Sequence, residues 1–148
     1  MKHSILLSLV VGPFIAAGLV GCAPANNDMK TLQGTWTLVS GEKDGEPLPE
    51  QDVKDSKLTI VGDTHTVQVG DMKLKGTQKL DSTKTPKQID ANDTEGPTIG
   101  LNFGIYEITP AGDFRVCFAP TGKERPTDFV TKPDSGHFAH LWHRLKSE

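Results

Sequence analysis

The chain has 148 residues, with 16 basic and 19 acidic side chains and a formal net charge of -3 at pH 7. This length favours a single domain, and the near balance of charge argues against a nucleic-acid-binding protein, which would carry a strong basic patch. Only 35% of the residues are hydrophobic. The apolar residues therefore have to lie on one face of each element if they are to form a core.

The first 21 residues have the layout of a secretory signal peptide. A short polar start precedes an almost wholly apolar run over residues 5–20, which is short for a membrane-spanning helix and is interrupted by Pro13. The run ends in the letters LVGC at residues 19–22, which match the lipobox of bacterial lipoproteins. We therefore expect residues 1–21 to be cleaved and Cys22 to carry lipid, palmitate included. The alternative is an ordinary secretion signal with an incidental cysteine.

The lipobox has consequences for location and for the mature chain. Two or more acyl chains make a stable anchor, so the expected partner is the membrane, through lipid on Cys22. Ala23 follows in place of the aspartate that resembles an inner-membrane retention signal, which favours the outer membrane, facing the periplasm or the cell surface. Residues 22–30 are polar and predict a flexible tether, and residues 31–148 then form the mature domain. Cys117 is expected to be a buried, unpaired hydrophobe.

The mature chain shows the two-residue periodicity of half-buried strands. The pattern predicts one short helix near residues 49–54 and a turn cluster at residues 92–97. The expected strands cover residues 32–38, the surroundings of Leu58 and Ile60, the surroundings of Val67 and Val69 with His65 on their face, residues 72–80, a weak strand around Ile89, and residues 101–109, 114–119 and 137–145.

About eight strands with short links and no helical period predict an all-β fold. Consecutive hairpins favour an antiparallel up-and-down barrel, which leaves no exposed strand edge. A two-sheet sandwich is the structural alternative. We expect the domain to be a monomer.

Residues 32–36, LQGTW, resemble the Gly-x-Trp signature that opens the first strand of lipocalins. More specifically, residues 32–146 are similar to a lipocalin-like domain family of uncharacterised exported proteins of planctomycete bacteria. The matching stretches are LQGTWTLVS, DGEPLPE, LTIVGD, GTQKLDSTKTPKQID, GIYEI, CFAPTGKERPTDF and KPDSGH. The resemblance implies a lipocalin-type barrel and brings no established activity with it.

One structural role is implied by the resemblance to lipocalins. There the tryptophan of the first strand packs at the closed end of the barrel beneath an arginine of the last strand. The corresponding residues here are Trp36 and Arg144, a contact worth about 0.5–2 kcal/mol. The pairing depends on which face of the last strand points inward, which the pattern leaves open.

The chemical motifs of the chain favour no catalytic, cofactor or metal site. His137, His140 and His143 could suggest a metal, but on a strand only the first and third share a face. The charged segment from Lys123 to Asp134, stiffened by prolines, is expected to be solvated surface. The resemblance covers this segment, and the alternative is that it has a fixed shape or a polar partner. No nucleophile elbow and no phosphate-binding glycine loop occurs in the sequence, so we expect a protein that is not an enzyme.

Two functions therefore compete. The first is a lipid-anchored envelope protein that binds a small apolar or amphipathic ligand inside the barrel. The second is a structural or protein-interaction module whose barrel is filled by its own side chains, such as Trp36 and Phe103. For the first, the candidate lining residues are Leu38, Leu74, Tyr106, Phe114, Val116 and Phe118.

Overall fold

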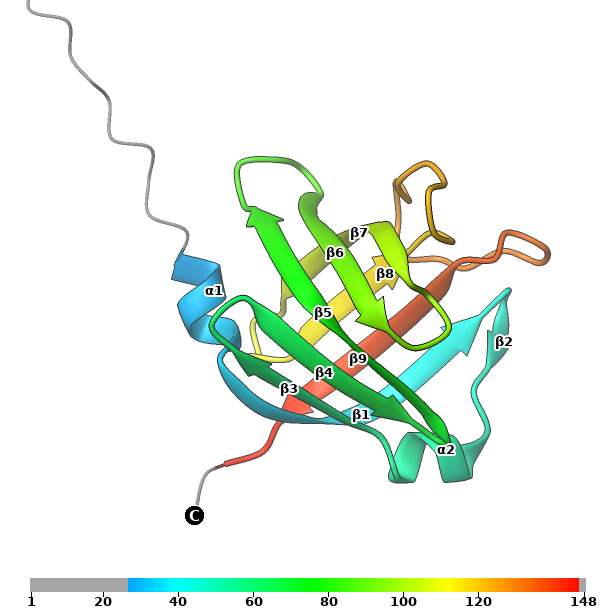
Figure 1. Cartoon of the computed structure of the whole chain (residues 1–148), viewed down its shortest axis with the longest axis horizontal. Helices are drawn as coiled ribbons and strands as arrows, with labels where there is room; N and C mark the ends of the chain where they lie inside the picture. Colours follow the sequence, from blue (N-terminus) through cyan, green and yellow to red (C-terminus); the bar gives the residue numbers. More distant parts are fainter. Residues whose placement is uncertain (1–26, 147–148) are drawn as a thin grey trace, which may run out of the picture.

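The computed structural model describes residues 27–146, which form an antiparallel β-barrel with two short helices (Figure 1). The expected signal peptide, Cys22 and the first part of the expected tether lie outside the described residues. The elements in chain order are α1 (Asn27–Leu32), β1 (Gly34–Lys43), β2 (Glu46–Pro47), α2 (Glu50–Lys54), β3 (Lys57–Val61), β4 (Thr64–Val69), β5 (Met72–Asp81), β6 (Lys87–Glu95), β7 (Gly100–Ile108), β8 (Phe114–Phe118) and β9 (Phe138–Arg144).

The barrel is an up-and-down meander of eight strands. Each of β3 to β8 pairs antiparallel with the next strand in the chain, β1 pairs with β3, and the two-residue β2 pairs only with the end of β1. The last strand then pairs with the first, from Trp36 opposite Arg144 to Lys43 opposite Phe138, so the sheet closes on itself. The all-β, eight-stranded, up-and-down barrel that the periodicity predicts is confirmed.

Closure depends on one irregularity in β1. The register with β9 shifts between Leu38 and Ser40, which leaves one extra residue in β1 at this point. Such a bulge bends a strand and changes the face that later residues present. Trp36 and Leu38 before the shift and Gly41 after it are all buried, whereas Val39 is exposed. The bulge therefore keeps both halves of β1 facing the interior.

One end of the barrel is closed by α1, Trp36 and Arg144. The guanidinium carbon of Arg144 lies 4.1 Å from the centre of the Trp36 ring, and the same group donates hydrogen bonds to the carbonyl oxygens of Gln33 and Thr31. The Trp36 indole N–H donates to the Leu32 carbonyl at 3.0 Å. The predicted contact of Trp36 with Arg144 is thus present, and it shows that Arg144 lies on the inward face of β9.

The structure corrects the expected boundary of the tether. Residues 27–30, expected to be flexible, form the first part of α1, and Leu32, expected to open the first strand, ends this helix. The Asp28 carboxylate accepts hydrogen bonds from Lys87 Nζ and from the Tyr106 hydroxyl, each at 2.8 Å. These contacts attach the helix to β6 and β7, and the sequence pattern does not reveal them because they join distant residues.

The Asp28 contacts alter the ionisation of both acidic groups. Burial alone would raise the pKa of Asp28, but the hydrogen bonds from Lys87 and Tyr106 together hold it below the ordinary value. Burial, followed by the neighbouring Asp28 carboxylate, raises the pKa of Tyr106. Asp28 therefore stays ionised and Tyr106 stays protonated as its donor.

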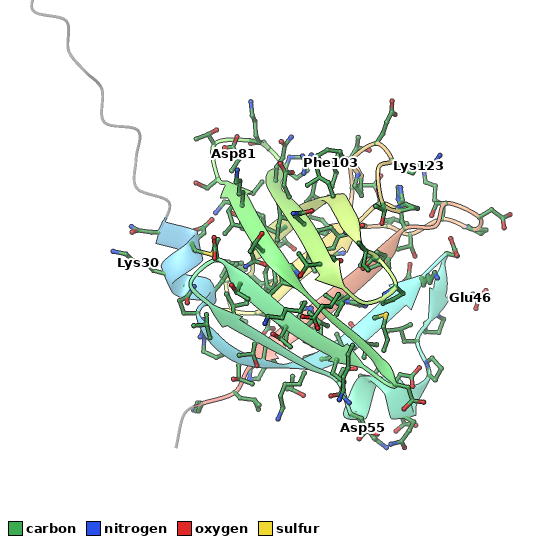
Figure 2. The ribbon with its side chains drawn as sticks, viewed as in Figure 1. Lys30, Glu46, Asp55, Asp81, Phe103 and Lys123 are labelled. Atoms are coloured by element: carbon green, nitrogen blue, oxygen red, sulfur yellow. The ribbon has the colours of Figure 1, made fainter. Side chains whose placement is uncertain are left out.

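The opposite end of the barrel carries α2 and the connections after β4, β6 and β8 (Figure 1). The expected helix near residues 49–54 is found as α2, with Pro49 immediately before it. Leu48 packs against the core where Gly41 has no side chain, because a Cβ at Gly41 would lie 2.3 Å from Leu48 Cδ1. Charged side chains such as Lys30, Asp55 and Lys123 point away from the barrel (Figure 2).

Residues 92–95 form part of a strand, whereas the sequence predicts a turn cluster over residues 92–97. They continue β6 to Glu95, and Asn92 and Asp93 pair with Leu101 and Gly100 of β7. The composition of this segment is typical of turns, but pairing on both sides satisfies its backbone groups and overrides that local preference. No helix among residues 27–146 is long and apolar enough to cross a membrane.

Part of the charged segment from Lys123 to Asp134 packs on the outside of the barrel. The Arg125 guanidinium donates to the carbonyl oxygens of Ile89 and Gly104, at 2.9 and 2.6 Å, and to Asp90 Oδ1 at 2.6 Å. It also lies over the Phe103 ring, 5.0 Å from the ring centre. Arg125 therefore fits the alternative of a loop with a fixed shape and not the expectation of solvated surface.

Cys117 is fully buried, as expected for a small hydrophobe. It lies on β8 opposite Ile105 and Ala139. Burial raises the pKa of its thiol to about 11, so the reactive thiolate is scarce near neutral pH.

We expect the Trp36–Arg144 contact to be energetically coupled. In a double-mutant cycle of Trp36→Leu and Arg144→Met, the free energies of unfolding should depart from additivity by about 0.5–2 kcal/mol. Urea denaturation followed by circular dichroism measures this. Arg115→Met is the matched control, since Arg115 lies over Phe129 and should be additive with Trp36→Leu. Additivity in the first cycle would contradict a barrel-closing role for the pair.

Candidate functional site

A cavity of about 60 Å³ lies inside the barrel. This volume accommodates about four groups the size of a water molecule. It is well below the roughly 300–1,000 Å³ typical of sites for drug-sized ligands. The lining side chains come from β3 to β9 and are Leu58, His65, Val67, Met72, Leu74, Gln78, Ile89, Ala91, Asp93, Asn102, Phe114, Val116, Phe118, Phe138, His140 and Trp142.

The cavity opens toward the end of the barrel that carries α2. Its partly exposed lining residues all lie in the part of their strand nearer that end; they are Val67, Met72, Leu74, Phe118, Phe138 and His140. By contrast, His65 and Trp142 are buried, with exposed fractions of 4% and 1%. A ligand would therefore enter past an apolar rim.

Four of the six predicted lining residues line the cavity, namely Leu74, Phe114, Val116 and Phe118. Leu38 and Tyr106 belong to the buried core but do not line the cavity. Leu38 lies opposite Trp142 in the register, and the indole of Trp142 lines the cavity at that level. Tyr106 directs its hydroxyl to Asp28 at the closed end. The periodicity predicts correctly that both side chains face the interior, but it does not show how far along the barrel axis each of them lies.

A row across three strands brings a histidine and an aspartate together inside the barrel. His65 on β4 lies opposite Gly76 on β5, and Gly76 lies opposite Asp93 on β6. Because Gly76 has no side chain, His65 Nε2 and Asp93 Oδ1 come within 2.8 Å of each other. A Cβ at Gly76 would lie 2.8 Å from the Asp93 Cα atom. The glycine is therefore what permits this buried pair.

Asp93 is the centre of a wider polar cluster. Its Oδ2 atom accepts hydrogen bonds from the Thr98 hydroxyl at 2.5 Å and from Asn102 Nδ2 at 3.1 Å. The Asn102 amide oxygen accepts in turn from the Thr121 hydroxyl at 2.7 Å. Asp93 and Asn102 are 6% and 2% exposed, and buried polar groups of this kind are normally satisfied by such bonds.

One atom of the cluster lacks a partner. Among the described residues, His65 Nδ1 is the buried side-chain nitrogen or oxygen for which the structure provides no hydrogen bond. An unsatisfied buried polar atom costs about 1–3 kcal/mol. His65 lines the cavity, so a group bound there could supply the missing bond.

The opposite wall of the cavity is aromatic. Phe138, His140 and Trp142 follow one another on the inward face of β9, with neighbouring ring centres 5.6 and 5.5 Å apart. Phe118 packs on Phe138 at 5.5 Å. Burial lowers the pKa of His140 to about 4. His140 is therefore neutral near pH 7 and acts as part of an apolar wall.

His137, His140 and His143, in β9 and immediately before it, do not come together in one site. His140 lines the cavity, whereas His143 is exposed and its Nδ1 atom lies 2.6 Å from Asp113 Oδ1. Within residues 27–146, no group of three or more histidine, cysteine or acidic side chains is arranged to hold a metal ion. His140 and His143 are an odd number of residues apart on a strand, which places them on opposite faces.

Sequence reasoning missed the polar wall of His65, Gln78, Asp93 and Asn102. A signal for His65 existed, because it alternates in phase with Val67 and Val69, whose face is apolar. Asp93 carried no such signal, because its segment resembles a turn. The partnership of His65 with Asp93 depends on strand register, which a single sequence does not reveal.

The lowered pKa of His140 predicts a pH-dependent stability. The folded protein keeps the ring neutral down to about pH 4, whereas the unfolded chain takes up a proton near pH 6.5. The unfolded state thus binds more protons in this window, and the free energy of unfolding should fall by up to about 3 kcal/mol as the pH drops from 6.5 to 4. The stability that Asp28 and Asp81 contribute through their lowered pKa values is lost as the pH falls through the ordinary carboxyl value of 3.8, at the lower end of this window and below it.

Thermal and urea unfolding between pH 7 and pH 4 measure this effect. His140→Phe should flatten the profile, and His143→Gln, at an exposed position, should leave it unchanged. If the free energy of unfolding depends on pH in His140→Phe as it does in the unaltered protein, His140 protonates as readily in the folded protein as in the unfolded chain.

Comparison of the chain with known protein families, with curated proteins and with solved structures finds no match. The geometry of the cavity is therefore the basis for a functional assignment.

Proposed function

We propose that this protein is a lipid-anchored cell-envelope protein whose barrel binds a small amphipathic molecule, without catalysing a reaction on it. The observation that carries the binding role is the cavity itself. It has an aromatic wall, a polar wall and an apolar rim at one end of the barrel. Cavities of mixed polarity with a few placed polar groups are typical of ligand sites.

The small volume limits the ligand. About 60 Å³ holds a head group and a few methylene groups, and a longer chain would have to leave past Met72, Phe118 and Phe138. Apolar contacts along this rim contribute about 0.8 kcal/mol for each buried methylene. The protein is therefore suited to capturing the end of an amphiphile and not to enclosing a large ligand.

The anchoring part of the proposal comes from the lipobox at Cys22. Only four residues separate Cys22 from Asn27, where α1 begins. An extended chain spans at most about 3.6 Å per residue. Lipidation of Cys22 would hold the closed end of the barrel within about 20 Å of the bilayer, in the outer membrane as the proposed location.

The same small volume favours a second candidate, the interaction module. In that case the cavity is a packing remnant in a barrel filled by its own side chains, among them the fully buried Trp36 and Trp142. The protein would then act through its loops on another envelope protein. The two candidates differ in whether the cavity is occupied in the cell.

Occupancy of the cavity can be tested by native mass spectrometry of protein purified from its own host. We expect a reproducible non-covalent adduct that is lost in Ala91→Leu, because Ala91 lines the cavity and the larger side chain fills it, with an overpacking cost of about 1–3 kcal/mol. Ala111→Leu, at an exposed turn position, is the matched control and should keep the adduct. Absence of an adduct from the unaltered protein, together with a cross-linked partner, would favour the interaction module.

Anchoring can be tested separately by detergent partition and intact mass. We expect the mature protein to enter the detergent phase with added acyl mass, and Cys22→Ser to lose both properties. Cys117→Ala is the control, since Cys117 is buried in the barrel, and it should partition like the unaltered protein. A mature protein that stays in the aqueous phase without acyl mass overturns the anchor.

A further inference from the structure

The unpaired atom of His65 indicates which head group the cavity accepts. The Asp93 carboxylate accepts hydrogen bonds from Thr98 and Asn102 on Oδ2, so its contact with His65 Nε2 places the ring proton on Nε2. If the ring carries only this proton, Nδ1 has a lone pair and its missing partner is a hydrogen-bond donor, whereas in a doubly protonated ring the partner would be an acceptor.

The charges around the cavity exclude an anionic head group. Among the described residues that line it, Asp93 is the one carboxylate and none is lysine or arginine. A bound carboxylate or phosphate would be buried near Asp93 without a counter-charge, and an unpaired buried charge is strongly unfavourable. The lone pair of His65 Nδ1 would repel such an oxygen as well.

We propose that the His65 ring carries a single proton, on Nε2, and that the cavity selects a small uncharged amphiphile whose head is a hydrogen-bond donor, such as a hydroxyl group, bound to His65 Nδ1. Its apolar chain lies against Phe138 and His140 and leaves the barrel past Met72. This inference rests on the proposed binding function and adds to it the chemical class of the ligand.

Four short probes of similar size test this selection. n-Hexanol has a donor head, pentyl methyl ether has the same number of heavy atoms and can only accept, hexanoate is anionic, and n-hexane lacks a head. Titration into the full mature domain, followed by backbone amide shifts in NMR, gives the four dissociation constants. We expect n-hexanol to bind about five- to tenfold tighter than the ether, the range of one neutral hydrogen bond, and hexanoate to bind at least tenfold more weakly than n-hexanol.

The contact itself has a direct signature in the unaltered protein. The Nδ1 resonance of His65 should move toward the position of a hydrogen-bonded nitrogen when n-hexanol is added, and stay in place with the ether. His143 is the internal reference, because its ring also contacts an aspartate, Asp113, but on the exposed surface. This measurement needs no variant, so it is independent of whether a substitution at His65 folds.

Substitution adds a second measurement. His65→Phe should lower the affinity for n-hexanol to that for the ether, whereas His143→Phe should leave both affinities unchanged. If alcohol and ether bind equally, or the Nδ1 resonance does not respond, the donor selection is overturned while the barrel remains a binding protein. If hexanoate binds as tightly as n-hexanol, the exclusion of anions is overturned. If none of the four probes binds, the proposed binding function fails together with the inference.

Discussion

The pairing of β1 with β9 is the constraint on which the rest of the structure depends. It joins the two ends of the domain, from Trp36 opposite Arg144 to Lys43 opposite Phe138, and leaves the barrel without an open edge in its wall. An unpaired edge would expose backbone groups that promote aggregation. The bulge at Val39 allows both halves of β1 to face inward, and the contact of Arg144 with Trp36 seals one end. The cavity inside the barrel therefore opens at the other end.

Inside this closed wall, a polar and an aromatic surface face each other. The polar surface exists because Gly76 lets His65 and Asp93 meet across β5. The aromatic surface follows from the inward face of β9, where His140 remains neutral through burial. Polar networks in a core are stable when every member is satisfied. This one leaves His65 Nδ1 without a partner, and the proposed ligand selection rests on that exception.

The connection between β8 and β9 gives the barrel a partial second layer. Arg125 binds two backbone carbonyl groups and Asp90 on the outside of β6 and β7, and Thr131 bonds to Glu42 of β1. Strand β8 is therefore buried on both faces, with Val116 inside the barrel and Cys117 beneath the outer layer. The outer layer thus covers the outside of the strand that carries Phe118 of the aromatic wall.

The sequence by itself determined that about eight strands follow one another in hairpins, and the face that several of them present, because period-two alternation is a local property of the chain. It placed Phe114, Val116 and Phe118 on one inward face, and the resemblance to lipocalins led to Trp36 and Arg144. Only the tertiary structure decided that residues 92–95 are strand, that Asp28 holds α1 on the barrel, and that His65 meets Asp93. These features depend on register and on contacts between residues far apart in the chain, and in a closed barrel one shift in register changes every such pair.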